Sequence, residues 1–269
     1  MPELTLLTLN IANPSLERAR RQLAWLAHRP EDVFILTETK ASEGCLALAE
    51  AFSTADYRVV CPEPVPGELG VMIVSKVEVE RDPLTSTLPY LPSRAAGVIV
   101  STTAGPLRVL GAYAPSRDSS PEKTDRKRRW LSDFTTSLTD AGRDPCLLLG
   151  DLNVLEPDHD PHYSFFAAFE YDFYRHLSTR CGLIDAFRHM HPQRSEHSWV
   201  GRTGDGYRYD HAHCSADLVP LLRTCEYVHE PRQTRLSDHS ALTVCLNLSP
   251  VAPLLTSDPV EAASEPMLF

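Results

Sequence analysis

Gly150-Asp151-Leu152-Asn153-Val154 follows directly on an apolar run, residues 146–149, and this order predicts a short buried strand. Side chains of an extended chain alternate between two faces, so Asp151 and Asn153 are expected on the same face. A carboxylate and a carboxamide aimed at one spot suit metal-assisted attack on a phosphate ester, in which the carboxylate takes a proton from water. The motif is short, and its meaning depends on what ends the other apolar strands.

Five more predicted strand boundaries carry polar side chains that could share one site. These are Asn10, Glu38, Tyr113, Asp210 and the pair Asp238-His239. If the strands lie side by side, the six positions converge on one rim of the fold. Hard oxygen ligands without thiolates favour Mg²⁺ or Mn²⁺ over zinc.

The order of these motifs resembles the endonuclease/exonuclease/phosphatase superfamily, the DNase I-like fold that includes abasic-site endonucleases and exonuclease III. The resemblance covers roughly residues 3–247, and the motifs that carry it are Leu9-Asn10-Ile11, Thr37-Glu38-Thr39-Lys40, Ala112-Tyr113-Ala114-Pro115, Gly150-Asp151-Leu152-Asn153, Arg208-Tyr209-Asp210 and Ser237-Asp238-His239-Ser240. The motifs around Glu38 and Asp151 lean toward the DNA-repair branch rather than the lipid and inositol phosphatases. The resemblance implies an α/β fold, a four-layer α/β/β/α sandwich of two mixed sheets with outer helices.

The resemblance also implies roles around a cation and a water molecule. Glu38 is expected to be the principal metal ligand, with Asn10 beside it and Asp238 pointing toward the metal side. Asp151 is expected to be the base that deprotonates or orients the attacking water, which Asn153 would position. Whether one cation or two take part stays open, because a second ion would need more carboxylates.

The same resemblance assigns three residues to the phosphate. His239 would donate a hydrogen bond to a non-bridging oxygen, while Asp210 on its other ring nitrogen would fix the tautomer and keep the ring cationic. Tyr113 would contact the phosphate or the leaving oxygen.

Three stretches depart from the family pattern or allow another interpretation. Ala12 stands where many abasic-site endonucleases carry an acidic or amide residue, so one ligand is missing unless Asn13 replaces it. The stretch His211-Ala-His213-Cys214 is either an added metal site or two histidines packed on alternate faces of a strand. The loop 156–162 is a metal cluster, a solvated loop or a substrate contact.

The formal charge of −10 argues against indiscriminate binding to nucleic acid, so local basic clusters must decide. The strongest cluster is the run 126–129, at the start of a helix predicted from Pro121. A basic run is usually a solvated face, but the resemblance places this one near the substrate, and Arg126 and Arg129 are candidate phosphate contacts. Trp199 either walls the pocket for an unstacked sugar or belongs to the core.

The length of 269 residues and a hydrophobic content of 42% predict one large domain, residues 1–248. Its expected helices include one with an inward stripe of Trp130, Leu131, Phe134 and Leu138. No apolar run is long enough for a membrane helix, and the first predicted strand leaves no room for a secretory signal. The seven scattered cysteines form no C-x-x-C pair and are expected to be reduced. We expect a cytoplasmic monomer that does not bind membranes.

Residues 249–269 contain four prolines, no Lys or Arg, and acidic residues as their only charges, which predicts a disordered acidic Pro-rich tail. Its tip, Glu265 to Phe269, resembles the Leu-Phe-ending peptides by which bacterial repair enzymes dock on the sliding clamp, although the usual leading Gln is absent. The clamp is therefore a candidate partner beside DNA.

These observations favour a divalent-metal phosphodiesterase that hydrolyses DNA, either an abasic-site endonuclease or a 3′ exonuclease. One alternative is a phosphomonoesterase or phosphodiesterase of the same fold that acts on a small-molecule or lipid phosphate, because a fold does not choose its substrate. The other is a non-catalytic nucleic-acid-binding module.

Overall fold

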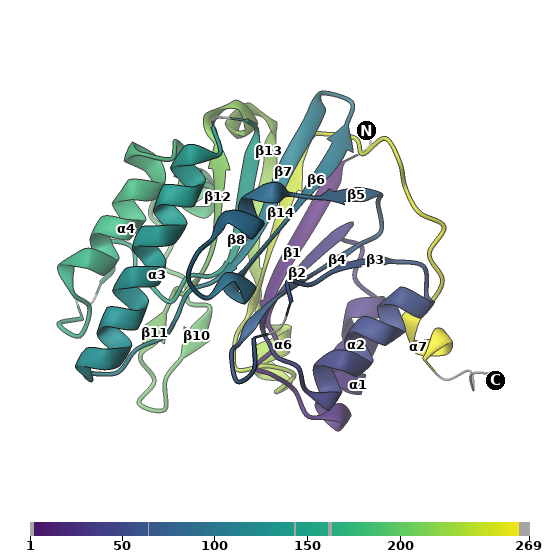
Figure 1. Cartoon of the computed structure of the whole chain (residues 1–269), viewed down its shortest axis with the longest axis horizontal. Coiled ribbons are helices and arrows are strands. Elements are labelled where there is room, and N and C mark those ends of the chain that lie inside the picture. Colours follow the sequence, from purple (N-terminus) through teal and green to yellow (C-terminus); the bar gives the residue numbers. More distant parts are fainter. Residues whose placement is uncertain (1–2, 64, 143, 161–162, 264–269) are drawn as a thin grey trace.

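Two six-stranded mixed sheets lie face to face in the computed structural model, which describes residues 3–63, 65–142, 144–160 and 163–263 (Figure 1). The first sheet contains, in spatial order, β13 (Leu222–Val228), β14 (Ala241–Leu246), β1 (Leu4–Asn10), β2 (Val33–Thr39), β4 (Gly70–Ser75) and β3 (Arg58–Val60). The second contains β5 (Val79–Arg81), β6 (Ala95–Thr102), β7 (Gly105–Tyr113), β8 (Cys146–Asp151), β12 (Asp210–Ser215) and β9 (Leu183–Asp185). A separate ribbon pairs β10 (Trp199–Val200) with β11 (Gly206–Tyr207).

Helices cover both outer faces of this pair of sheets. The helices α1 (Leu16–Ala27) and α2 (Glu43–Thr54) lie on the first sheet, and α3 (Pro121–Asp140) and α4 (Ala168–Thr179) lie on the second (Figure 1). Shorter helical segments are α5 (Ala186–Met190), α6 (Glu230–Gln233), α7 (Pro259–Ala262) and the 3₁₀ turns Pro83–Thr87, Pro92–Arg94 and Ala216–Leu221. The predicted four-layer sandwich is confirmed. Within the described ranges, no helix has the length and apolar character needed to cross a bilayer.

Three hydrophobic cores fill the spaces between the four layers. Strand β1 shows how the sequence builds them, because Leu4 and Leu6 face the second sheet while Leu7 and Leu9 face α1 and α2. A strand buried on both faces reads as a continuous apolar run. The predicted stripe of α3 is buried against the second sheet, as expected from its helical spacing.

Helix starts follow local capping chemistry. Helix α3 begins at Pro121, as predicted, with Ser120 as its cap. Helix α1 begins at Leu16, and the Ser15 side chain caps it. The side chain of Asn13 is already engaged, because it accepts a hydrogen bond of 2.7 Å from the Ser42 hydroxyl.

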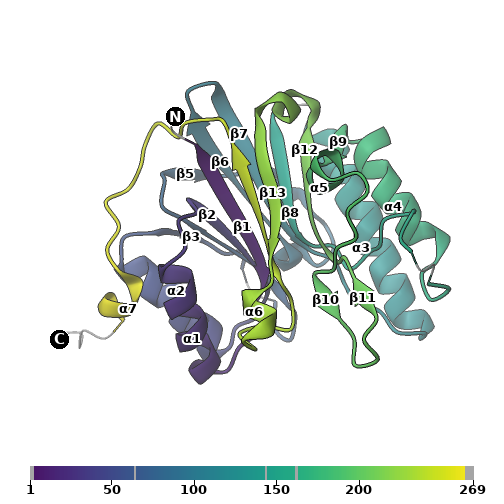
Figure 2. The same ribbon diagram turned by 180° about the vertical axis from the view of Figure 1, so that it is seen from behind.

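The expected disordered tail is wrong for residues 249–263. After β14 the chain crosses both sheets at one end of the sandwich, bonding to Ser101 and Thr102 of the second sheet and to Lys76 and Val77 beside the first. It then runs down to α7, which packs on α1 and α2 (Figure 2). The prediction from composition failed because proline, which has no backbone N–H to donate, is well suited to a segment that runs along the edge of a sheet. The proposed clamp-binding tip lies outside the described residues.

Candidate active site

Strand alternation brings Asn10 and Asp151 together across the two sheets. Asn10 lies an even number of residues from Leu4 and Leu6, so it is on the same face of β1. Asp151 is likewise on the same face of β8 as Leu147 and Leu149. All four leucines face the space between the sheets. Both polar residues end their strands, so they lie at the mouth of that space. The Asn10 Nδ2 group donates to Asp151 Oδ2 at 2.9 Å and to Glu38 Oε2 at 3.0 Å. The predicted convergence on one rim is therefore present.

Glu38 reaches this mouth through a β-bulge. In regular β2 geometry it would share the face of Phe34 and Leu36, which pack against the outer helices. The pairing of β2 with β4 shifts register between Thr37 and Thr39, and Glu38 has a φ of 59°. A bulge of this kind re-aims a side chain. The strained residue is thus the one expected to hold the cation, which is typical of functional sites.

Tyr113 closes one side of the site above a buried arginine that was not predicted. The Tyr113 hydroxyl donates to Glu38 Oε2 at 3.3 Å. Burial and the negative charge of Glu38 raise the pKa of Tyr113, so its hydroxyl keeps its proton at any physiological pH. Arg94 lies with its guanidinium 4.8 Å from the Tyr113 ring centroid and donates to the Tyr113 carbonyl at 3.3 Å. The only sequence signal for Arg94 was its place just before an apolar strand.

Asp210 and His239 form the predicted dyad. The His239 Nδ1 lies 2.7 Å from Asp210 Oδ2, and both side chains are buried. The loop before β14 holds the ring in place, because the Ser237 hydroxyl accepts from the His239 backbone amide at 3.1 Å. The same hydroxyl donates to the carbonyl of Asn10, which ties the dyad to the first sheet.

Burial and neighbouring charges shift both titrating groups at this mouth. Burial and the negative charge of Asp210 raise the pKa of Asp151 to about 7. Burial lowers the pKa of His239, but the Asp210 charge and hydrogen bond outweigh it, and the net result is a pKa of about 10. Near neutral pH the ring is therefore a cation beside a carboxylate that can take up a proton.

The structure also defines which groups could hold a cation. Among the described residues, Asp151, Asp210 and His239 offer ligand atoms that all lie within 4.8 Å of one another. Because His239 Nδ1 is already bonded to Asp210, the carboxylate oxygens are the better donors for Mg²⁺ or Mn²⁺. Glu38 accepts both of its hydrogen bonds through Oε2, which leaves Oε1 without a bond to another described residue. This oxygen-rich donor set fits a hard divalent cation.

Two expected ligands have different surroundings. Asn10 directs its amide nitrogen at the two carboxylates, while its Oδ1 accepts from the Ala12 amide at 2.9 Å, so it orients Glu38 and Asp151. Asp238 is exposed and accepts from the Trp199 indole at 3.0 Å. Asn13 does not replace the ligand missing at Ala12, because it is turned toward α2.

Asn153 lies beside Asp151, but the expected extended geometry is wrong. Strand β8 ends at Asp151, and Asn153 has a φ of 50°. Its backbone amide donates to Asp151 Oδ1 at 2.9 Å, and its side-chain amide donates to the Ala114 carbonyl at 3.0 Å. Lys127, from the middle of the basic run, is buried and donates to the Asn153 carbonyl at 2.5 Å. This lysine supports the turn instead of facing solvent.

The alternative metal sites are not supported. His211 and His213 are two residues apart and therefore share one face of β12, not alternate faces, where both rings contact Tyr174. His211 is bonded to the Val154 carbonyl, and within the described ranges neither histidine belongs to a group with metal-ligand spacing. The carboxylate of Glu156 forms ion pairs with Arg188 and Arg208. Residues 161–162 of that loop lie outside the described residues.

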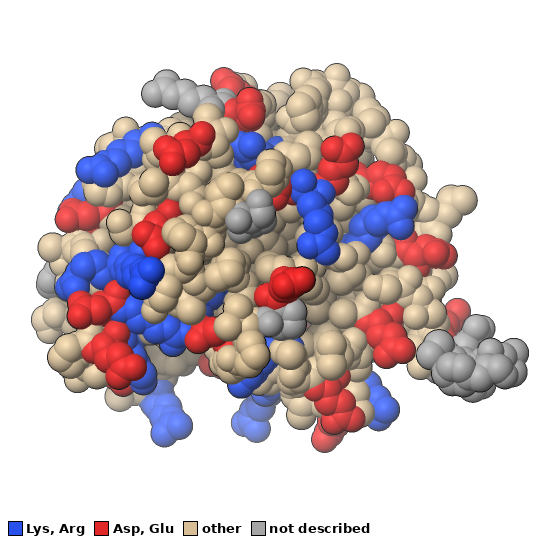
Figure 3. Space-filling model, viewed as in Figure 1, with Lys and Arg blue, Asp and Glu red and all other residues tan. Residues whose placement is uncertain are grey.

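The basic run of α3 is largely neutralised. Figure 3 shows Lys and Arg side chains at the lower left of the molecule, over α3 and α4, with acidic side chains among them. Arg126 forms an ion pair with Glu68, and Arg129 lies 4.1 Å from the Tyr90 ring centroid with Asp133 3.8 Å away. These partners do not prevent phosphate contact, but they reduce the free positive charge.

Trp199 lies beside the dyad, outside the three cores. It pairs with His239 in an isolated β-bridge and is half-buried. Its ring centroid is 5.6 Å from that of Tyr207 and 6.0 Å from that of Tyr209, and the two tyrosines stack at 5.2 Å. Trp199 therefore does not belong to a core cluster, and its role as a pocket wall stays a prediction. The tyrosines were not singled out in the sequence, although their spacing of two across Arg208 indicated a shared face.

Gly150 sets the position of Asp151. It has a φ of 144°, and a Cβ at this position would meet the Ala112 carbonyl oxygen at 2.0 Å. We expect Gly150→Ala to destabilise the protein by about 3 kcal/mol or more, through backbone strain and forced separation of β7 and β8. Gly105→Ala is the control, because Gly105 also has a positive φ but no atom within 4 Å of such a Cβ. Urea unfolding measures both, and equal losses would contradict the proposed clash.

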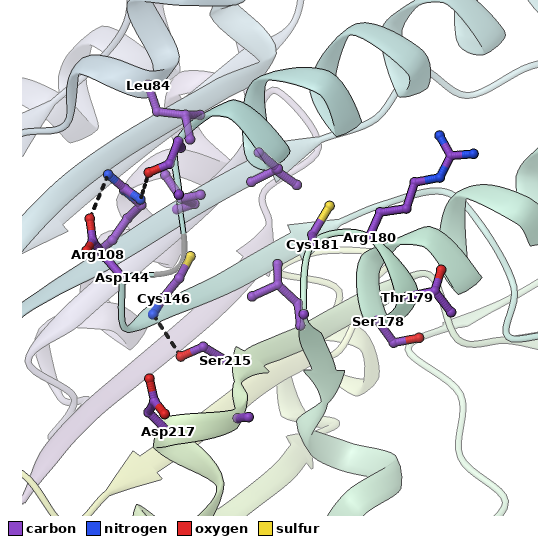
Figure 4. Close-up of a pocket in the computed structure, with 17 residues that line it drawn as sticks. Leu84, Arg108, Asp144, Cys146, Ser178, Thr179, Arg180, Cys181, Ser215 and Asp217 are labelled. Atoms are coloured by element: carbon purple, nitrogen blue, oxygen red, sulfur yellow. Dashed lines mark hydrogen bonds and ion pairs between the residues drawn. The ribbon is translucent and has the colours of Figure 1, made fainter.

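A cavity outside the carboxylate cluster lies at the opposite end of β8. It has a volume of about 360 Å³ and lies among Arg108, Cys146, Cys181 and Ser215 (Figure 4). The strand between Cys146 and Asp151 separates it from the site by about 16 Å. Burial raises the pKa of the Cys146 thiol to about 12, so this cysteine is inert. This cavity is separate from the carboxylate cluster.

Comparisons with known proteins agree with the observed fold. Residues 7–239 match the Endonuclease/Exonuclease/phosphatase family. No curated protein sequence matches the chain. An AP endonuclease from Archaeoglobus fulgidus superposes with a TM-score of 0.75 at 23% identity, covering 91% of this chain and 99% of that one. A 3′–5′ exonuclease from Neisseria meningitidis gives 0.74 at 25% identity, with 90% and 98% covered. A 3′ phosphatase from Neisseria, bound to a product DNA hairpin, gives 0.74 at 24% identity over the same shares.

Proposed function

The chain belongs to the endonuclease/exonuclease/phosphatase family, and we propose that it is a divalent-metal-dependent phosphodiesterase that hydrolyses DNA, as an abasic-site endonuclease or a 3′ exonuclease. The observation that carries this proposal is the contact of Asn10 with both Glu38 and Asp151, beside the Asp210–His239 dyad. A base, a cationic donor and a cation-binding carboxylate thus share one mouth. That set suits phosphoester hydrolysis.

The reaction is a displacement at phosphorus. Asp151 takes a proton from the attacking water as the water oxygen bonds to phosphorus. The bond to the leaving oxygen breaks, and that oxygen takes up a proton from solvent. The His239 cation donates a hydrogen bond to a non-bridging oxygen, where negative charge builds up. The Tyr113 hydroxyl lies on the Glu38 side and can donate to the phosphate or the leaving oxygen.

Glu38 would hold the cation through Oε1, oriented by Asn10, with Asp238 beside it on the loop that carries His239. When bound, Mg²⁺ or Mn²⁺ supplies Lewis-acid stabilisation of the charge on the phosphate oxygens. Asn153 and the turn that Lys127 supports fix the Asp151 carboxylate, because the Asn153 amide bonds to Asp151 Oδ1.

The aromatic residues favour a nucleic-acid substrate over a lipid or inositol phosphate. Trp199, Tyr207 and Tyr209 form a surface beside the dyad on which a base or an unstacked sugar can pack. The test is a cleavage assay with Mg²⁺ on a duplex with one abasic site, an undamaged recessed duplex, a duplex with a 3′ phosphate, and inositol phosphates. Incision only at the abasic site supports the endonuclease. Turnover of inositol phosphate alone would overturn the proposal.

Removal of the metal ligand should make activity depend on much higher metal concentrations. We expect Glu38→Gln to raise the Mg²⁺ concentration for half-maximal rate by about a hundredfold or more, since even supporting groups of metal sites are worth 10–100-fold. Glu80→Gln is the matched control on exposed β5. A Mg²⁺ titration of cleavage measures both. An unchanged titration curve for Glu38→Gln would remove Glu38 from the cation site.

The pH profile should report the two shifted groups. Asp151 has a pKa raised to about 7, so it acts as a base only once it loses its proton, and the rate should increase with pH through that value. His239 keeps its proton up to a pKa of about 10, where the rate should fall again. Between about pH 6 and about pH 8 we expect roughly a tenfold rise in kcat/KM. A flat profile across this interval would show that Asp151 is not the base.

A further inference from the structure

A pocket lined by three arginines adjoins the catalytic residues. It has a volume of about 490 Å³, and its wall includes Arg18 of α1, Arg232 of α6, Arg235, and the exposed Asp238. Its position follows from the chain, because its remaining wall includes Ala12, two residues after Asn10, and Ser237, two residues before His239. The Ser237 hydroxyl also bonds to the Asn10 carbonyl and the His239 amide, so the pocket adjoins the segments that carry these two residues.

None of these three arginines forms an ion pair with a described residue. Arg18 donates to the carbonyls of Ala12 at 2.5 Å and Asn13 at 3.4 Å, and its Nε is buried without a hydrogen-bond partner among the described residues. Arg232 donates through Nε to the Ser240 hydroxyl at 3.1 Å. Neutral oxygens thus hold two guanidinium groups in place without cancelling their charge.

The contrast with helix α3 is informative. The arginines of its basic run lie against carboxylates, as in the Arg126–Glu68 and Arg128–Asp125 pairs. The pocket instead combines three guanidinium groups with one carboxylate, Asp238, in a protein of net charge −10. Guanidinium groups match the geometry of phosphate oxygens and bind them with charge-assisted hydrogen bonds. The pocket is therefore built for an anion with several oxygens.

We propose that this pocket binds a backbone phosphate next to the scissile one in a nucleic-acid strand. The inference rests on the proposed function and adds a second phosphate subsite to it, so the substrate must carry at least two successive phosphates. A strand offers a phosphate every 3.4 Å or so of helix axis, so a neighbour of the phosphate at His239 falls within reach. A phosphomonoester or a single nucleotide has no second group to place there.

The test measures DNA affinity against salt in an Asp151→Asn background, which separates binding from turnover. We expect Arg232→Gln/Arg235→Gln to weaken binding about tenfold or more at low salt and to make the slope of log K against log salt shallower by about one, the value for one phosphate. Arg58→Gln/Arg223→Gln is the matched control, because both residues are exposed and lie at the strand ends remote from the mouth. This control should keep the slope of the background protein.

Each outcome bears on a separate claim. If Arg232→Gln/Arg235→Gln has the same slope as the control, the proposed phosphate site in the pocket is wrong, even if the wild-type protein cleaves DNA as proposed. A wild-type protein that neither binds nor cleaves DNA would overturn the proposed function and the pocket with it. Arg235→Gln alone provides a variant at an exposed position that should fold, and it should shift the slope in the same direction. An unchanged slope in this folded variant together with an unfolded double variant would also count against the proposal.

Discussion

Asp151→Asn should lower kcat by about 10³ to 10⁴ while leaving DNA affinity within a few-fold of the wild-type value. General-base catalysis contributes up to about that factor, and the amide cannot accept the proton of the attacking water. The substitution keeps the shape of the side chain and an oxygen that can accept from Asn10 or Asn153. Single-turnover cleavage and equilibrium binding, measured on the same duplex, separate the two effects.

The same variant should not unfold the protein. Burial and the Asp210 charge raise the pKa of Asp151 to about 7, against an ordinary value of 3.8, so its ionised form is disfavoured in the folded state. This cost is absent below about pH 4, grows as pH rises toward 7, and is complete above it. A neutral Asn avoids it, so the Tm of Asp151→Asn at pH 8 should equal or exceed that of the wild type. Asp217→Asn, at an exposed position far from the mouth, should change neither activity nor Tm.

A fall in Tm that tracks the fall in kcat would show that Asp151 is structural. Loss of DNA affinity in parallel with kcat would instead place it among the binding residues. Either result would also weaken the assignment of the lower limb of the pH profile.

Strand alternation made much of this site predictable. Asn10, Asp151 and Tyr113 end their strands. Side chains two residues apart share one face of a strand, and the apolar residues on that face lie between the sheets, so the position of these three residues could be predicted. The position of Glu38 could not be predicted in this way. Regular alternation along β2 would direct its side chain toward the outer helices, and only the bulge after Thr37 turns it toward the space between the sheets. The family motif identified Glu38, whereas its local pattern alone could not.

The predictions that were wrong concern residues whose conformation or charge depends on contacts between distant segments of the chain. Asn153 was expected in an extended strand, but the Lys127 and Ala114 contacts hold it in a left-handed turn. The arginines 18, 232 and 235, which form no ion pair with a described residue, are scattered in sequence, whereas the conspicuous run at 126–129 is tied to acidic partners. Local charge density in a sequence says nothing about which charges find a partner.

His239→Gln should lower kcat by about 10² to 10³, because it removes a cationic donor aimed at developing charge. Asp210→Asn should cost a similar factor near pH 8 by a different route. Without the Asp210 carboxylate, burial lowers the pKa of His239 and only the smaller effects of the Asp151 and Asp238 charges oppose it, so the ring loses its proton at a lower pH. The upper limb of the pH profile should therefore move down from about 10 in Asp210→Asn.

The double variant decides whether the two residues act as one unit. If Asp210 works by keeping His239 charged, Asp210→Asn/His239→Gln should be no slower than His239→Gln, apart from the lowered pKa of Asp151 once the neighbouring charge is gone. That second change has its own signature, because the lower limb should move below 7 in both variants that lack Asp210. In His239→Gln it should move the other way, since the ring cation that lowers the pKa of Asp151 is lost. Losses that multiply in the double variant would mean that Asp210 acts separately, as a cation ligand or on Asp151, and the 2.7 Å contact with His239 would be incidental to catalysis.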